Sequence, residues 1–171
     1  MKVAPYVAVV GPGEATREQI DAAERIGRGL AGRGAVLVCG GLGGVMEAAA
    51  RGAAEAGGTV VGLLPGRDRA AGNRHLTVAV PTGLGHARNV LVAAAGDALV
   101  ALPGAHGTLA EIAFARVLGR PVVVLGAWRG VSGVIRARTP AEAVRRALVL
   151  AARQRAGARG RGAGRGGGGL R

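Results

Sequence analysis

Aromatic side chains and lysine are almost absent from this sequence, and each absence removes a class of function. Tyr6, Phe114 and Trp128 are the only aromatic residues among 171, so the body of the chain offers no platform on which nucleic-acid bases could stack. Lys2 is the only lysine. The body therefore lacks the residue that a Schiff base, a pyridoxal phosphate site or a Walker-type phosphate loop requires.

Cysteine and long apolar runs are also scarce. Cys39 stands alone, which excludes an intrachain disulfide and a cysteine metal cluster. We expect it to be buried in the packing at the end of a strand. His75 and His86 show no metal-ligand spacing, so we expect no metal site. No apolar run is long enough to cross a bilayer, and the N-terminal one is too short for a signal peptide. We therefore expect a cytoplasmic protein without a membrane contact.

Positive charge is plentiful but unevenly distributed. The formal net charge is +13, and residues 153–171 carry six arginines and no acid, which leaves +7 on residues 1–152. The Gly/Arg segment cannot bury apolar surface. We therefore predict a domain over residues 1–152 and a disordered tail over 153–171. Weak electrostatic contact between this tail and nucleic acid stays open.

Apolar, valine-rich runs alternate along the chain with longer, alanine-rich stretches that favour helix. The runs occupy residues 6–10, 35–39, 59–64, 76–80, 98–102 and 121–125. The predicted helices cover 17–31, 45–56, 86–95, 109–118 and 140–153. Continuous apolar strands are typical of a parallel sheet that is covered on both faces. The order predicts an α/β fold, a Rossmann-like, doubly wound and mainly parallel sheet with helices on both faces.

Three glycine-rich turns follow predicted strands, where such sheets bind ligands. Gly11-Pro12-Gly13 comes after the first strand, and Thr16 with Gln19 then forms a capping-box pattern. The other two turns follow the second and fifth strands, and their sequences are Gly40-Gly41-Leu42-Gly43-Gly44 and Pro103-Gly104-Ala105-His106-Gly107-Thr108.

Glycine serves a phosphate site in two ways, since it adopts positive φ and lets backbone N–H groups approach an anion. The helix that follows each turn adds free N–H groups and the positive end of its dipole. Any tight strand-to-helix turn favours glycine, but three such turns at strand ends favour a phosphate site. No G-x-G-x-x-G follows the first strand, which argues against dinucleotide binding.

These motifs together resemble those of the Lonely Guy (LOG) and DprA-related superfamily. The run Cys39 to Met46 is similar to its GGGxxGxM turn, and the run Pro103 to Glu111 is similar to its PGGxGTxxE motif. Arg88 stands where the family carries its motif arginine. The opening Val9 to Gly13, with 62–66 and 82–85, is closer to the branch that holds the molybdenum-cofactor carrier proteins. The resemblance covers roughly residues 6–126.

The resemblance implies two activities. LOG enzymes hydrolyse the N-glycosidic bond of cytokinin nucleoside monophosphates, and in such an enzyme Arg88 and Glu111 would be the catalytic residues. The carrier branch binds the molybdopterin cofactor without a known reaction. Ala105 and Asn89 depart from the LOG pattern, which argues against hydrolysis. The label "lysine decarboxylase" carried by many relatives does not fit a body without lysine.

Several candidate residues have a structural alternative. Thr108 and Glu111 could form a capping box, which would explain Glu111 without catalysis. The functional interpretation places the Glu111 carboxylate beside a bound sugar, where it stabilises oxocarbenium-like charge or directs a water molecule. Arg88 would pair with phosphate, since its guanidinium matches phosphate geometry. Met46 is a core or a ligand-contacting residue, and His106 lines the site at most.

We therefore predict a carrier that binds a phosphorylated, nucleotide-like ligand, either a nucleoside monophosphate or a molybdopterin-type cofactor as cargo, and that requires no cofactor of its own. A nucleoside 5′-monophosphate phosphoribohydrolase is the alternative, and a DNA-associated protein related to DprA is a weaker one. The resemblance also implies a homodimer or larger homo-oligomer. The predicted ligand-binding residues are Gly11, Gly13, Gly40, Gly41, Gly43, Gly44, Met46, Arg88, Gly104, His106, Gly107, Thr108 and Glu111.

Overall fold

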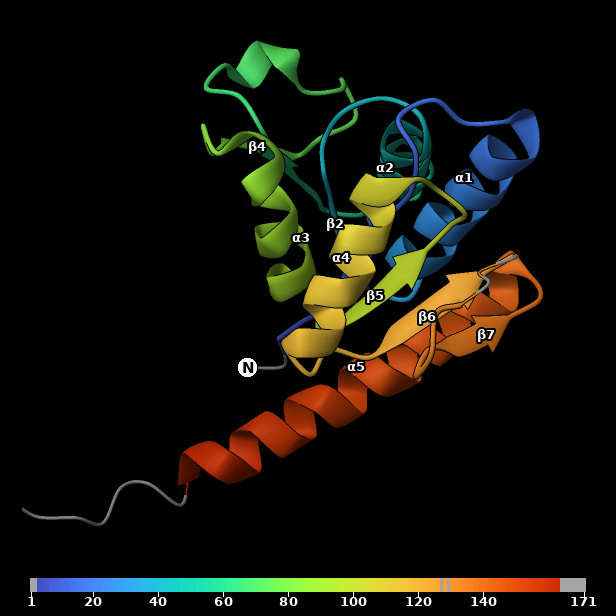
Figure 1. The fold of residues 1–171 in the computed structure, drawn as a ribbon, viewed down its shortest axis with the longest axis vertical. Coiled ribbons are helices and arrows are strands. Elements are labelled where there is room, and N and C mark those ends of the chain that lie inside the picture. The colour runs from blue at the N-terminus through green and yellow to red at the C-terminus, as the bar shows by residue number, and fades with distance from the viewer. Residues whose placement is uncertain (1–2, 127, 129, 164–171) are drawn as a thin grey trace, which may run out of the picture.

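The apolar runs form one sheet of seven strands in the computed structural model, which describes residues 3–126, 128 and 130–163 (Figure 1). The strands are β1 (Tyr6–Val10), β2 (Val36–Cys39), β3 (Val60–Leu64), β4 (Val78–Pro81), β5 (Ala98–Ala101), β6 (Val122–Leu125) and β7 (Ile135–Ala137). The helices are α1 (Arg17–Ala31), α2 (Val45–Glu55), α3 (Asn89–Ala95), α4 (His106–Val117) and α5 (Pro140–Ala163), with 3-10 turns η1 (Arg69–Ala71) and η2 (Gly85–Arg88).

Every pair of neighbouring strands is parallel, and the strand order is β4-β3-β2-β1-β5-β6-β7. The chain moves outward from β1 in one direction and returns to add β5 on its other side. The topological switch point therefore lies between β1 and β5, where the carboxyl ends of such sheets leave a crevice. The predicted Rossmann-like, doubly wound α/β fold is confirmed.

Helices cover both faces of the sheet, because alternate strand side chains point to opposite faces. Val7 and Val9 pack with α1, α2 and α5, whereas Ala8 and Val10 pack with α3 and α4. Figure 1 shows α3 and α4 together on one side of the sheet and α1 with α2 on the other. Both faces of the central strands are therefore buried, as their continuous apolar sequences predict.

Helices α1 and α2 approach closely at two glycines. A Cβ atom on Gly27 would collide with the Ala49 carbonyl oxygen, and one on Gly52 would collide with the Glu24 carbonyl oxygen. Ion pairs flank this contact: Arg51 Nη2 lies 2.6 Å from Glu24 Oε2, and Arg28 Nη2 lies 3.0 Å from Glu24 Oε1. Because α1 and α2 follow the first two glycine turns, their close packing fixes the position of one turn relative to the other.

Most predicted elements are present, with different ends. The helix predicted over 86–95 is divided into η2 and α3, and the helix predicted over 109–118 begins earlier, as α4 (His106–Val117). β7 was not predicted, because its three residues include Arg136 and lack an apolar run. The predicted capping box of α1 is confirmed, since Gln19 N donates to Thr16 Oγ1 at 3.3 Å and Thr16 N donates to Gln19 Oε1 at 2.9 Å.

The last helix is longer than expected. α5 continues to Ala163, so helix covers residues 153–163 of the segment predicted as a disordered tail, and residues 164–171 lie outside the described residues. Alanine and arginine favour helix strongly enough to outweigh single glycines such as Gly157. In the described part of the chain, no helix combines the length and the hydropathy needed to cross a membrane.

The α1–α2 contact gives a first prediction. Alanine normally stabilises a helix relative to glycine, but Gly52→Ala should lower the free energy of unfolding by about 1–3 kcal/mol, because its Cβ meets a backbone carbonyl. The measurement is urea unfolding followed by circular dichroism. Gly157→Ala, at an exposed position of α5, is the control and should be neutral or stabilising. Equal effects at both positions would contradict the close contact.

Candidate functional site

The first two glycine turns are joined by their backbones. Val45 N, at the start of α2, donates to Pro12 O at 3.0 Å. Gly44 has φ +64°, and a Cβ there would collide with the carbonyl oxygens of Pro12 and Gly13. Glycine is therefore required at position 44 for this junction, which explains the residue without a ligand.

The third turn packs against the first. A Cβ on Gly104 would collide with Thr108 Oγ1 and would lie 3.3 Å from Pro12 Cδ. Gln19 Nε2 of α1 donates to Pro103 O at 2.8 Å, which ties α1 to the turn after β5. The structure therefore brings all three predicted turns together at the switch point between β1 and β5.

The glycines of these turns serve different purposes. Gly11 is a packing residue, since its Cβ would lie 2.6 Å from Val45 Cγ1, and Gly41 has φ +76° and packs against Leu64. Gly13 has no heavy atom within 4 Å of a Cβ position, and Gly43 has only Gly13 O, at 3.8 Å. Gly13 and Gly43 therefore leave room at the edge of the sheet, and a ligand could approach their backbone there.

Two helices begin at this edge without a side-chain cap. Gly44 is the N-cap of α2 and Ala105 is the N-cap of α4, and neither makes a side-chain capping bond. The first N–H groups of a helix have no intrahelical acceptor, and the dipole adds positive potential. Val45 N of α2 is already bonded to Pro12 O, so the N–H groups that follow it in α2 and those that begin α4 are the donors open to an anion.

Arg88 is the charged centre of the site. It ends η2 and is the N-cap of α3, only 6% of its surface is exposed, and its Nε has no hydrogen-bond partner among the described residues. Its guanidinium lies over Gly40, where a Cβ would collide with Nη1. Burial lowers the pKa of Arg88, while the nearby Glu111 charge acts in the opposite direction. Burying an arginine with an unpaired Nε is costly, so this group marks a place where an anion would bind favourably.

Glu111 is buried beside this charge, and the predicted capping box that would have explained it is wrong. The N-cap of α4 is Ala105, so Thr108 and Glu111 both lie inside the helix. Glu111 is 6% exposed. Burial raises the pKa of its carboxyl to about 7, although the positive charge of Arg88 opposes this shift. No ion pair within 4 Å joins Arg88 and Glu111 among the described residues, so each keeps hydrogen-bonding capacity for a ligand.

Cys39 lies at the same place but takes a structural role, as predicted. It is fully buried at the end of β2, and burial raises the pKa of its thiol to about 11. Both Arg88 and Glu111 influence this thiol electrostatically. The three side chains therefore lie close enough to influence one another electrostatically, although they come from β2, η2 and α4.

The remaining predicted residues lie around this centre. Met46 Sδ lies 2.6 Å from the Cβ position of Gly40, so this thioether flanks the Arg88 guanidinium. Thr108 is buried with its hydroxyl over Gly104, whereas His106 is exposed as the first residue of α4. Thr108 and Met46 thus shape the site from inside, and His106 lies at its rim.

Two asparagines also belong to the site, Asn89, which the sequence marked only as a departure from the LOG pattern, and Asn73, which it did not single out. Asn89 is buried next to Arg88, and its Nδ2 lies 3.8 Å from the Cβ position of Gly107. Asn73 closes the second turn, because its backbone N donates to Gly41 O at 2.9 Å and its Nδ2 donates to Leu42 O at 3.0 Å. Asn73 lies in an irregular segment, so no periodicity could have connected it to a turn more than 30 residues earlier.

Comparison with known proteins identifies relatives of this chain. A protein of Archaeoglobus fulgidus with no assigned function is 42% identical over 138 residues, which is 81% of this chain and 91% of that protein. The molybdenum cofactor binding protein of Rippkaea orientalis has a similar structure, with a TM-score of 0.83 and 31% identity, covering 88% of this chain and 99% of that one.

The molybdenum cofactor carrier protein of Chlamydomonas reinhardtii is also similar, with a TM-score of 0.81, 33% identity and the same two coverages. DprA from Streptococcus pneumoniae has a TM-score of 0.68 and 18% identity, and the match covers 83% of this chain and 61% of the DprA chain. At this identity the two proteins share the fold alone. The model of the SLOG cluster4 family matches residues 4–154. With the three joined turns and the buried arginine described above, this match means that the chain belongs to the SLOG cluster4 family.

Proposed function

We propose that this protein binds a phosphorylated, nucleotide-like small molecule at the carboxyl edge of its sheet and acts as a carrier, with a molybdopterin-type cofactor as cargo. The observation that carries the proposal is the buried guanidinium of Arg88, whose Nε meets no hydrogen-bond partner in the part of the chain that the structure describes. A phosphate is the anion that suits it, because a guanidinium matches phosphate oxygens in charge and geometry.

The surroundings of Arg88 supply the rest of a phosphate site. The uncapped N-termini of α2 and α4 offer backbone N–H donors, and Gly13 and Gly43 leave space for the phosphate oxygens. Thr108 adds a hydroxyl within the first turn of α4. These neutral donors and one charge fit a single phosphate group better than a long polyanion.

Glu111 would recognise the part of the ligand beyond the phosphate. With a pKa of about 7, its carboxyl is largely protonated at slightly acid pH and can then both donate and accept a hydrogen bond. The edges of pterin and purine rings carry alternating N–H donors and acceptors, so such a carboxyl fits either ring. Pterin binding is favoured by the two structural relatives, which carry or bind the molybdenum cofactor.

A hydrolytic reaction is the second candidate, and the buried carboxyl of Glu111 favours it. With a pKa near 7, the group lies in the range suited to general acid–base catalysis. In that reaction a water molecule would add to the anomeric carbon of a nucleoside monophosphate, the N-glycosidic bond would break, and the base would leave with a proton. Arg88 would hold the phosphate in either function.

Two experiments test the carrier proposal: identification of any ligand that stays bound during purification, and measurement of ligand affinity in the variant Arg88→Met. Mass spectrometry of the purified protein should find a phosphorylated pterin or nucleotide. Arg88→Met should weaken the binding of AMP or a pterin phosphate at least about tenfold, because a charge-assisted hydrogen bond contributes roughly 1.5–3 kcal/mol. The thermal midpoint should stay equal or rise, since the variant removes an unpaired buried charge.

Arg25→Gln, at an exposed position of α1, is the matched control for the change in net charge and should leave calorimetric binding unaltered. Unchanged affinity in Arg88→Met would contradict the proposed site. A large loss of stability would show instead that this guanidinium is required for folding.

Glu111 should make ligand binding and stability depend on pH. Its folded-state pKa of about 7 lies above its ordinary value, so its contribution to stability is complete below about pH 4.5 and is lost as the pH rises through 7. Above pH 7 the carboxylate should also repel a bound phosphate. Glu111→Gln should therefore be more stable than the wild type at pH 8 by on the order of 1–3 kcal/mol.

The same variant separates the carrier from the hydrolase. For a carrier, affinity for AMP should fall from pH 6 to pH 8.5 in the wild type more steeply than in Glu111→Gln, measured by calorimetry. For a hydrolase, the wild type should release free adenine faster as the pH rises through 7, and Glu111→Gln should release none. Identical pH profiles for binding in the two proteins would exclude Glu111 from the ligand site.

We also propose that the protein forms a homodimer or larger homo-oligomer. Several apolar side chains of the α4 region are exposed, among them Val117 at 84%, and exposed apolar clusters are typical of interfaces. Light scattering should give at least twice the monomer mass for the wild type, and Val117→Asp should reduce it. A monomeric wild type would contradict this proposal.

A further inference from the structure

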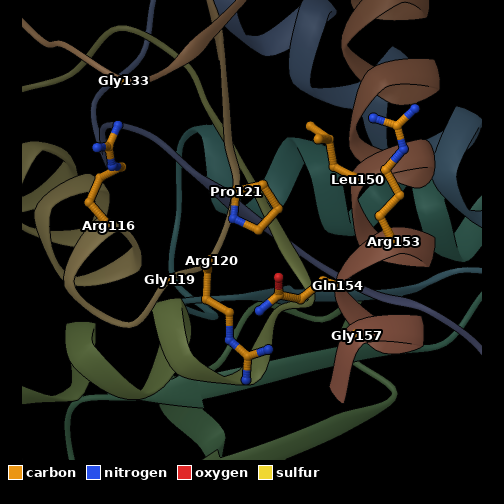
Figure 2. A pocket seen from close by; sticks show the side chains of 9 residues that line it. All are labelled: Arg116, Gly119, Arg120, Pro121, Gly133, Leu150, Arg153, Gln154 and Gly157. Atoms are coloured by element: carbon orange, nitrogen blue, oxygen red, sulfur yellow. The ribbon is translucent and has the colours of Figure 1, made fainter. Parts of the chain in front are cut away.

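A hollow lined by arginines lies at the edge of the sheet opposite to the turns described above. It has a volume of about 540 Å³ and is formed where β6 begins, between the end of α4 and the second half of α5. Figure 2 shows Arg116 and Arg153 on opposite sides of this hollow, with Arg120 and Gln154 between them. None of these residues belongs to the proposed phosphate site.

The hollow continues into a second one along α5. Leu150 and Arg153 line both, and the second hollow adds Arg145 and Arg146. Five arginines thus line these two adjoining hollows, which we together call the arginine groove and define by Arg116, Arg120, Arg145, Arg146 and Arg153. No acidic residue lines either hollow in the part of the chain that the structure describes.

Most charges of the arginine groove have no counter-ion among the described residues. Of its five arginines, only Arg146 has a carboxylate within 4 Å, with its Nη2 2.8 Å from Glu142 Oε1, among the described residues. In contrast, a hollow at the other end of the molecule mixes Arg17, Arg25 and Arg138 with acidic Glu18 and Asp21. The arginine groove is therefore a region of unusually concentrated positive potential.

Two of the arginines are held in place by the backbone. Arg116 Nη1 donates to Ser132 O at 2.9 Å, and Arg120 Nη2 donates to Ala94 O at 3.1 Å. Gly133, with φ +66°, leaves the space that the Arg116 guanidinium occupies. Each of these two guanidinium groups has further N–H donors beyond its bond, so both can also bind an anion while the backbone holds them in place.

We propose that the arginine groove binds the phosphate backbone of a nucleic-acid strand. The groove spans two adjoining hollows, so its charges match a row of phosphates and not a single one. No aromatic residue lines it in the described part of the chain, and its contacts would be with phosphates, which carry no sequence information. The affinity would be independent of base sequence and would fall as the salt concentration rises.

The test uses the full-length protein and a fluorescently labelled dT20 oligonucleotide, with anisotropy measured at several salt concentrations. The triple variant Arg116→Gln, Arg120→Gln, Arg153→Gln should bind at least tenfold more weakly at low salt. The slope of log K against log[salt] should become shallower by about 2, since each phosphate contact with a single strand contributes about 0.7. The variant Arg145→Gln, Arg153→Gln removes no side-chain hydrogen bond that these two arginines make to the described residues, so its loss of affinity reports on the charge.

Two control variants keep the chain complete and remove comparable charge elsewhere. Arg17→Gln, Arg25→Gln, Arg138→Gln removes three arginines of the mixed hollow, and the second variant changes Arg159, Arg161, Arg165 and Arg171 to Gln. Both should retain most of the wild-type affinity and salt slope. Losses in either control as large as those in the groove variants, or unaltered dT20 binding in the groove variants, would overturn the proposal.

Discussion

The guanidinium of Arg88 is the charge around which the candidate site is organised. It is buried over Gly40, flanked by Met46 and close to Glu111, and no described residue offers its Nε a hydrogen bond. A protein interior rarely leaves such a group unpaired, because desolvating a charge without a compensating interaction is costly. The cost is understandable if the fold is stabilised further when an anion occupies the site.

The parallel sheet explains how this arrangement is built from distant parts of the chain. The carboxyl ends of β1, β2 and β5 meet at one edge, so the turns after them pack against one another through Pro12, Gly44 and Gly104. The rigid α1–α2 contact and the bond from Gln19 to Pro103 hold the turns from behind. The site therefore depends on backbone packing more than on any one side chain.

The two edges of the sheet differ in how they present positive charge. At the carboxyl edge, one buried arginine and uncapped helix N-termini form a site suited to a single phosphate. At the opposite edge, several arginines line an open groove with few counter-ions. In the two functions proposed above, the first arrangement would select a compact ligand by geometry, and the second would attract an extended polyanion by charge density. The two sites are separated by the sheet and can be studied by independent substitutions.

Much of the fold could be predicted from the sequence alone, because its signals are local. Valine runs without polar interruption indicated strands buried on both faces, Thr16 and Gln19 marked the start of α1, and the glycine turns followed the strands. β7 and the far end of α5 were missed, since Ile135–Ala137 is too short for a pattern and the Gly/Arg segment reads as polar low complexity.

The candidate residues of the site could also be named from the sequence, but their roles could not. Whether Glu111 caps α4 or is buried beside Arg88 depends on where that helix begins. Because the N-cap is Ala105, Glu111 lies inside the helix and is buried. The contribution of Asn73 and the arginine groove depended on contacts between segments far apart in the chain. Sequence determines which local structures are favourable, whereas burial, pKa and the convergence of charges arise only when the sheet brings separate elements together.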